Sequence, residues 1–112
     1  MKFRKESKME KYNIQITEPA ENDLHQIRNY ISEELLESAV ANRIINKIGE
    51  AIFTLEEMPV RNAIVSDKRL AAQGIRKILI ENYIVFYIVS EENKMVTVLR
   101  ILYCRRNWVD LL

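Results

Sequence analysis

Residues 75–103 read IRKILIENYIVFYIVSEENKMVTVLRILY and decide the fold of this chain. Three runs within this stretch, residues 75–80, 83–89 and 95–103, are rich in β-branched and aromatic residues, which favour strands. Glu81-Asn82 and residues 90–93 separate the runs, and connections this short join antiparallel neighbours. The stretch therefore predicts a three-stranded antiparallel meander.

The sequence before this stretch predicts one strand followed by two helices. Apolar and polar residues alternate over residues 11–17, as in a strand, and apolar residues then recur at helical spacing over residues 20–35. The same helical period returns over residues 41–58, with Ser38 as a candidate N-cap and Pro59 as the residue that stops the helix. Because the link between the two helices is very short, we expect an antiparallel helical hairpin.

The complete element order is β-α-α-β-β-β, which predicts an α+β domain with the helical hairpin packed on one face of a mainly antiparallel sheet. Residues 59–74 are expected to form a loop with one turn of helix at residues 67–72, ended by Gly74. Residues 105–112 predict a short C-terminal helical tail. A chain of 112 residues suffices for one domain, placed at residues 10–112, and residues 1–9 are expected to be an N-terminal extension that need not be ordered.

Composition restricts the class of protein. The chain has 48% hydrophobic residues but no apolar run long enough to span a membrane and no apolar signal sequence at its start, so we expect a cytoplasmic protein without membrane contact. The single cysteine, Cys104, excludes an internal disulfide. A net charge of only +1 argues against binding nucleic acid through many phosphate contacts, and no direct sequence-specific nucleic-acid binding is expected of the chain alone.

Charge is distributed unevenly along the chain. Residues 11–60 carry four Lys/Arg against nine Asp/Glu, whereas residues 61–112 carry nine against five. An acidic half and a basic half in one small domain can produce an oriented field that steers a charged partner. The alternative is ordinary ion pairing between the two halves, which is the commoner origin of any single surface charge.

Alternation along the predicted strands divides their side chains between two faces of the sheet. One face is predicted to carry Arg76, Ile78, Ile80, Tyr83, Val85, Tyr87, Val96, Val98 and Arg100. The other is predicted to carry Ile75, Lys77, Leu79, Ile84, Phe86, Ile88, Met95, Thr97, Leu99 and Ile101. Both sets are largely apolar, so the face without the helical hairpin needs the C-terminal tail or a partner chain as cover.

Common catalytic and cofactor motifs are absent from the sequence. One histidine, His25, and one cysteine, Cys104, cannot make the usual clusters of a structural zinc site. Gly49 and Gly74 alone cannot form a Gly-rich phosphate loop. We expect no metal and no cofactor, an exposed His25, and Cys104 as a small packing residue.

Six charged residues are candidates for specific roles. Arg76 and Arg100 lie on one predicted face with Tyr83 and Tyr87, which permits a cationic, aromatic floor for phosphate and base. The favoured alternative is structural, with both arginines in ion pairs to carboxylates of the first helix such as Asp23. The remaining three, Lys77, Arg105 and Arg106, are the candidate cations facing a target.

The motifs of the chain, taken together, resemble the RelE/ParE toxin superfamily of type II toxin–antitoxin systems over residues 10–112. The N-terminal half carries the string Tyr12-x-Ile-x-Ile-Thr-x-x-Ala20, followed by Asp23-Leu24-x-x-Ile27-x-x-Tyr30-Ile31. The second half carries Gly74-Ile-Arg76-Lys77, Asn82-Tyr-x-Val-Phe-Tyr87-x-Val and Val98-Leu-Arg100-Ile-Leu-Tyr-Cys-Arg105-Arg106-Asn-Trp108. No single motif is highly specific, but their order and spacing are.

The resemblance implies the β-α-α-β-β-β fold and a growth-inhibiting toxin that a cognate antitoxin holds inactive. RelE-like members cut messenger RNA on the ribosome, whereas ParE-like members inhibit DNA gyrase. The resemblance also implies a surface for the target or the antitoxin, and the candidates are Lys77, Tyr103, Arg105, Arg106 and Trp108.

Details of the sequence favour the ParE-like, plasmid-stabilisation branch. Lys77 and Arg105 match cation positions of the RelE-like branch, but Ile84 replaces another cation and Leu111 replaces a frequent tyrosine. Losing one charge from such a cluster costs a few kcal/mol of transition-state stabilisation, so RNA cleavage is expected to be impaired or absent. The stretch Arg100-Ile-Leu-Tyr-x-Arg105-Arg106 is closer to the ParE-like ending, although ParE-like chains commonly have histidine where Tyr103 stands. The alternatives are a ribosome-dependent endoribonuclease using Lys77, Arg105 and Tyr103, and a degenerate, non-toxic binding module.

Overall fold

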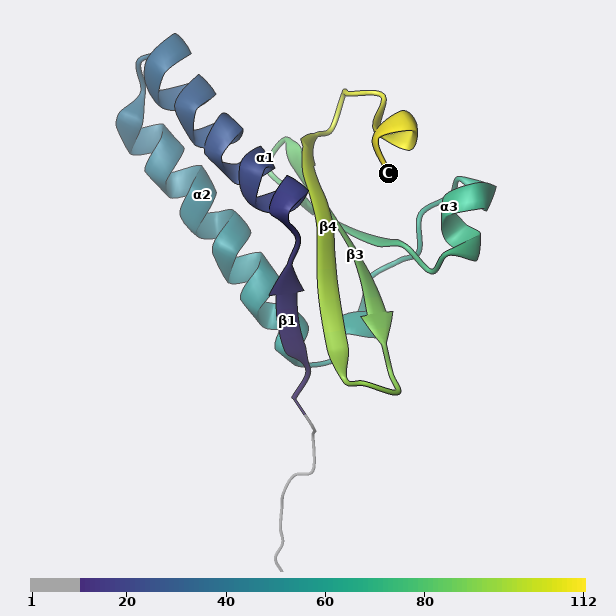
Figure 1. Ribbon diagram of the computed structural model, residues 1–112. Helices are drawn as coiled ribbons and strands as arrows, with labels where there is room; N and C mark the ends of the chain where they lie inside the picture. The colour runs from purple at the N-terminus through teal and green to yellow at the C-terminus, as the bar shows by residue number, and fades with distance from the viewer. Residues whose placement is uncertain (1–10) are drawn as a thin grey trace, which may run out of the picture.

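The computed structural model describes residues 11–112, which form a four-stranded sheet with a helical hairpin on one face (Figure 1). The strands β1 (Asn13–Ile16), β2 (Arg76–Ile80), β3 (Tyr83–Ser90) and β4 (Met95–Tyr103) are arranged in the order β1-β4-β3-β2. β1 is parallel to β4, and the other pairs are antiparallel. The predicted α+β class and element order are confirmed. The extension expected at residues 1–9 lies outside the described residues.

Two helices join β1 to the rest of the chain. α1 (Glu18–Asn29) begins after Thr17, whose hydroxyl accepts a hydrogen bond from the backbone N–H of Ala20 at 3.2 Å. α1 runs into a π-helical turn, Tyr30–Glu34, before α2 (Ser38–Phe53). Ser38 was expected to cap α2, but it is the first helical residue, and Glu37 takes the capping position without a side-chain hydrogen bond.

The second helix is also shorter than the apolar periodicity predicts. α2 ends at Phe53, and the chain continues as a 3-10 turn, Thr54–Glu56, that keeps Leu55 buried. A second 3-10 turn, Pro59–Arg61, follows, and then the short helix α3 (Lys68–Ala72), whose N-cap is Asp67. Gly74 after α3 has a φ of 77°, a left-handed conformation that glycine adopts without a steric penalty and that ends the helix as predicted.

The hairpin and one face of the sheet enclose the larger of two apolar cores. It contains buried residues of α1, the π-helical turn and α2, namely Ala20, Ile27, Ile31, Ala41, Ile44, Ile48 and Ile52. The sheet contributes Ile80, Val85, Tyr87, Val96, Val98 and Ile101. These residues recur at the helical period in the hairpin and alternate in the strands, which explains why the sequence folds this way.

The chain itself covers much of the second face of the sheet, and the C-terminal tail, one of the two covers expected from the sequence, forms part of this cover. α3 and the C-terminal 3-10 turn, Trp108–Leu111, pack on this face. Trp108 contacts Phe86 with their ring centroids 5.0 Å apart. On the outer strand β2, however, Leu79 keeps 65% of its surface exposed.

A β-bulge changes the faces predicted for the end of β4. Phe86 is paired with Arg100, but the next residue, Tyr87, is paired with Val98, so Leu99 is the extra residue of β4. The alternation therefore shifts after Val98. Ile101 joins the core beneath the hairpin, and Arg100 lies opposite Phe86 of the second face, the reverse of the sequence prediction.

Candidate functional site

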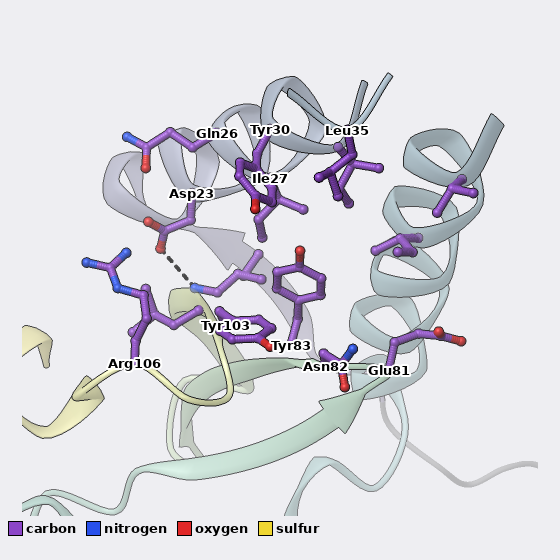
Figure 2. Close-up of a pocket in the computed structure, with 15 residues that line it drawn as sticks. Asp23, Gln26, Ile27, Tyr30, Leu35, Glu81, Asn82, Tyr83, Tyr103 and Arg106 are labelled. Atoms are coloured by element: carbon purple, nitrogen blue, oxygen red, sulfur yellow. Dashed lines mark hydrogen bonds between the residues drawn. The ribbon is translucent and has the colours of Figure 1, made fainter. Parts of the chain in front are cut away.

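An open groove lies between the hairpin and the end of the sheet (Figure 2). Its volume is about 620 Å³. One wall comes from α1 and the π-helical turn and another from the start of α2, while the β2–β3 turn and the end of β4 close the sheet side. We call this cavity the groove; its lining is Asp23, Gln26, Ile27, Tyr30, Ile31, Leu35, Val40, Ile44, Glu81, Asn82, Tyr83, Ile101, Leu102, Tyr103 and Arg106.

The groove has an apolar floor and amphipathic walls. Ile27, Ile31 and Ile44 in the floor are buried and belong to the core beneath the hairpin. In the walls, Tyr30 is 54% exposed and Leu35 is 50% exposed. Large apolar side chains this exposed around one cavity are typical of a surface that a partner covers.

Tyrosines give the groove its polar character. Tyr83 and Tyr103 are directly opposite on β3 and β4, and their rings meet edge to face with centroids 5.8 Å apart. Burial, followed by the proximity of Tyr103 and Tyr30, raises the pKa of Tyr83. The Tyr83 phenol therefore stays neutral and can donate a hydrogen bond.

An ion pair fixes one end of the groove. Asp23, only 5% exposed, accepts hydrogen bonds from Arg100 Nε at 2.7 Å and Nη2 at 2.8 Å, and from the backbone N–H of Ile101 at 2.9 Å. Arg100 also donates to the carbonyl of Leu111 at 3.2 Å. The hydrogen bond to Asp23 raises the pKa of Arg100. Arg100 thus joins α1 to the C-terminal turn, as part of the structure and not as a phosphate-binding floor.

A second set of ion pairs holds the β2–β3 turn at the opposite end of the groove. Glu81 bonds Lys47 Nζ at 2.9 Å and Arg43 Nη1 at 3.2 Å, both on α2. Lys47, and then Arg43, lower the pKa of Glu81. Glu81 has a φ of 56°, a left-handed conformation that is uncommon for a residue with a side chain. The sequence showed Glu81 only as a turn residue, and its pairing with α2 has no local signal.

Arg76 is also structural, but its partners differ from the expected carboxylates. Its Nη1 donates to the carbonyl oxygens of Asn62 at 2.6 Å and Val60 at 3.1 Å. Nearby, the Tyr87 hydroxyl donates to the carbonyl of Pro59 at 2.6 Å. These bonds tie the loop after α2 to β2 and β3, so Arg76 and Tyr87 are occupied in holding the fold together.

The residues expected to contact a target or an antitoxin do not gather in one place. Tyr103 and Arg106 line the groove, and Arg105 is exposed beside them. Lys77 is paired with Phe86 on the second face, and Trp108 packs on that face as well. Within residues 11–112 the side chains of Lys77, Arg105 and Arg106 have no ion-pair partner.

The three ribonuclease candidates therefore do not form a common site. Tyr103 faces the groove with Tyr83, whereas Lys77 lies on the opposite face of the sheet with Phe86. Concerted acid–base catalysis needs its groups within hydrogen-bond reach of one substrate. The geometry gives no support to a reaction shared by Lys77, Tyr103 and Arg105.

Metal-binding and membrane-spanning features are not found in the described part of the chain. Among residues 11–112 no three His, Cys, Asp or Glu side chains lie close enough to hold a metal ion. His25 is exposed, and Cys104 is partly buried beside the core of the second face. No helix in the same range is long and apolar enough to cross a membrane.

Residues 14–108 match the model of a protein family described as "ParE toxin of type II toxin-antitoxin system, parDE". The chain belongs to the ParE toxin family. Its fold is similar to that of a chain in the chromosomal ParDE toxin–antitoxin system of P. aeruginosa, with a TM-score of 0.68 and 20% identity, covering 84% of this chain and 97% of that one. A chain in the RelBE2 toxin–antitoxin complex of Mycobacterium tuberculosis gives a TM-score of 0.64 and 22% identity, covering 88% and 97%. No curated protein matches in sequence.

The chain is therefore a ParE-family toxin of a type II toxin–antitoxin system. The family match confirms the resemblance inferred from the motifs of the sequence. The matched residues include both sides of the groove, from α1 to Arg106. At 20% and 22% identity the two solved structures support the RelE/ParE fold alone. The function of the groove therefore has to be argued from its own chemistry.

Proposed function

We propose that this ParE-family toxin arrests growth in the cytosol by binding DNA gyrase, and that a cognate antitoxin neutralises it by filling the groove. The observation that carries the antitoxin part is the groove itself, an apolar cavity of about 620 Å³ whose walls are left half exposed. The two similar solved structures both come from toxin–antitoxin systems, which supports a protein partner of that kind.

The shape and chemistry of the groove suit an amphipathic helix. Such a helix binds through apolar residues spaced at i, i+3, i+4 and i+7, which would meet the isoleucine floor between Tyr30 and Tyr103. Arg106 at the rim calls for an acidic residue on the same helix, because its guanidinium has no ion-pair partner within residues 11–112. Arg105 offers a second cation just outside the groove.

The positions of the candidate catalytic residues and the small net charge favour gyrase over the ribosome as the target. Lys77 and Tyr103 lie on opposite faces of the sheet, and Ile84 is buried where the RelE-like branch has a cation. The net charge of +1 is small for a protein that competes for ribosomal RNA. These features support inhibition by binding and not by RNA cleavage.

The experiment is induced expression of the full chain, with plating, sequencing of RNA ends, and a supercoiling assay with purified gyrase. We expect growth arrest, inhibited supercoiling and intact messages. Cut messages would overturn the choice of target in favour of the ribosome. Unchanged growth despite soluble, folded protein would overturn toxicity and favour a binding module.

Antitoxin recognition is tested by charge reversal at the rim of the groove. Arg106→Glu should weaken binding of the co-expressed antitoxin at least tenfold, since it replaces attraction with repulsion. The matched control is Arg61→Glu, an exposed arginine in the 3-10 turn Pro59–Arg61 that does not line the groove. Equal antitoxin affinity for both variants would show that Arg106 does not contact the antitoxin.

A further inference from the structure

The closed end of the helical hairpin, residues 30–37, exposes more apolar surface than a simple turn requires. We call these residues the hairpin tip. Leu36 is 83% exposed, the highest value among the large hydrophobic residues of the described chain, and Leu35 is 50% exposed. Neither leucine belongs to the core beneath the hairpin. Figure 1 shows this closed end of the hairpin standing away from the sheet.

The local backbone explains how the two leucines come to face solvent. The π-helical turn Tyr30–Glu34 widens the end of α1, with the N–H of Leu35 bonded to the carbonyl of Tyr30 at 3.1 Å. Ile31 stays buried beneath this turn. Leu36 then has a φ of 54°, the left-handed region that glycine or asparagine would fill more easily. A polar loop would close the hairpin equally well, so the leucines need another explanation.

The charged residues within the hairpin tip all have one sign. Glu33 and Glu34 are exposed, and within residues 11–112 neither has an ion-pair partner. Glu37 precedes α2, where the helix dipole favours a negative charge, and this accounts for an acidic residue at that position. An apolar tip with an acidic rim is complementary to an apolar depression surrounded by Lys and Arg, and it repels nucleic-acid phosphates.

We propose that the hairpin tip is the surface by which this toxin contacts its target, and that the complementary surface is a basic, apolar-lined face of a protein that itself binds nucleic acid. Leu36 is the anchor, and Glu33 and Glu34 meet the basic rim. This inference rests on the proposed function, because it assigns a surface to the binding event that causes toxicity.

The position of the tip also accounts for neutralisation. Tyr30 and Leu35 line the groove and belong to the hairpin tip, whereas Leu36 belongs to the tip alone. An antitoxin helix in the groove therefore covers one side of the tip and excludes the target by overlap. The two partners share Leu35 but are separable at Leu36.

The first test replaces Leu36, which lies outside the groove and the core. Leu36→Asn suits the left-handed backbone and removes the apolar anchor, and Leu36→Met keeps an apolar side chain. The matched control is Phe53→Asn, 65% exposed at the other end of α2. We expect Leu36→Asn to be less toxic, so that plating efficiency under induction rises tenfold or more above that of the parent. The methionine variant and the Phe53 control should stay as toxic as the parent.

A folded Leu36→Asn variant, shown by its circular dichroism and thermal unfolding, that kills as efficiently as the parent would overturn the inference while leaving the proposed function intact. A parent chain that is folded but not toxic would instead overturn the proposed function, and the inference with it. The two failures are therefore distinguishable within one experiment.

The second test concerns the acidic rim and uses purified gyrase. Glu33→Lys combined with Glu34→Lys should raise the concentration for half-inhibition of supercoiling about tenfold, and Glu50→Lys, an exposed glutamate of α2, is the control. Equal inhibition by both variants would show that Glu33 and Glu34 do not contact a basic surface of the target. If the parent does not inhibit gyrase, the target assignment fails, and the plating test of Leu36 still decides the role of the tip.

Discussion

The ion pair between Asp23 and Arg100 gives the sharpest prediction about stability. The Asp23 carboxylate is 5% exposed and accepts three hydrogen bonds, two of them from Arg100 at 2.7 and 2.8 Å. We replace Arg100 with methionine, which keeps much of the side-chain length and removes the charge. The buried carboxylate then keeps only the backbone N–H of Ile101 as a donor.

The expected cost follows from the burial of the two partners. Removing one member of a buried ion pair costs about 3–5 kcal/mol, because an uncompensated charge stays behind. The Arg100 side chain is 22% exposed, so water can solvate part of the vacated site, and the lower figure of about 3 kcal/mol applies. For a domain of about 100 residues this corresponds to a decrease in Tm of roughly 12–24 °C. Asp23→Asn should cost less, about 1.5–3 kcal/mol, because the amide oxygen can still accept from Ile101.

The assay is urea denaturation followed by circular dichroism and by the fluorescence of Trp108, the single tryptophan. Arg100 also bonds the carbonyl of Leu111, so its loss should loosen the C-terminal turn and shift Trp108 emission to longer wavelength in native buffer. The double variant of Asp23→Asn with Arg100→Met should cost less than the sum of the single changes by at least about 1 kcal/mol. Arg105→Met, at an exposed arginine, is the control.

Two results would refute this reasoning. If the free energy of unfolding of Arg100→Met lies within about 0.5 kcal/mol of the parent value, as expected for the Arg105 control, the pair does not stabilise the fold. If the two single changes add without coupling, their effects do not come from the contact between Asp23 and Arg100.

Three further changes test other contacts. Tyr87→Phe removes the buried hydroxyl that donates to the carbonyl of Pro59 and should cost about 1–2 kcal/mol in urea denaturation. Glu81→Gln should lower Tm at pH 7, and this effect should shrink as the pH is lowered below 4.5. Lys47 lowers the pKa of Glu81 from its ordinary value of 4.5, so the stabilisation is present above pH 4.5 and is lost as the pH falls through the lower folded-state pKa. Trp108→Ala should cost about 2 kcal/mol by circular dichroism, because the ring packs on the sheet but is only partly buried.

Much of the fold was predictable because its signals are local. The strands β2, β3 and β4 follow from runs of β-branched and aromatic residues, and the hairpin follows from helical spacing. The turn of helix ended by Gly74 was also predictable, since a positive φ favours glycine. The π-helical turn was not, because it extends the apolar period of α1 without a break in the sequence.

What the sequence missed at the site has two physical causes, an irregular strand pairing and contacts between residues far apart in the chain. Alternation predicts faces only while strand pairing is regular, and the bulge at Leu99 reverses it for Arg100 and Ile101. Asp23 was nevertheless matched to Arg100, because a buried arginine needs a carboxylate. The groove and the ion pairs of Glu81 with α2 depend on residues far apart in the sequence, so periodicity could not reveal them.

The separation of charge between the two halves of the chain persists in the folded state. Ordinary pairing between the halves was the alternative explanation, and it would require acids of residues 11–60 to meet cations of residues 61–112. Asp23 and Arg100 do so, but Arg43 and Lys47 of the acidic half pair in the opposite sense with Glu81. These pairs take two cations and one acid from the acidic half, so its excess of negative charge is not cancelled. The hairpin tip therefore remains acidic while Arg105 and Arg106 remain free within residues 11–112, an arrangement that suits two partners of opposite charge.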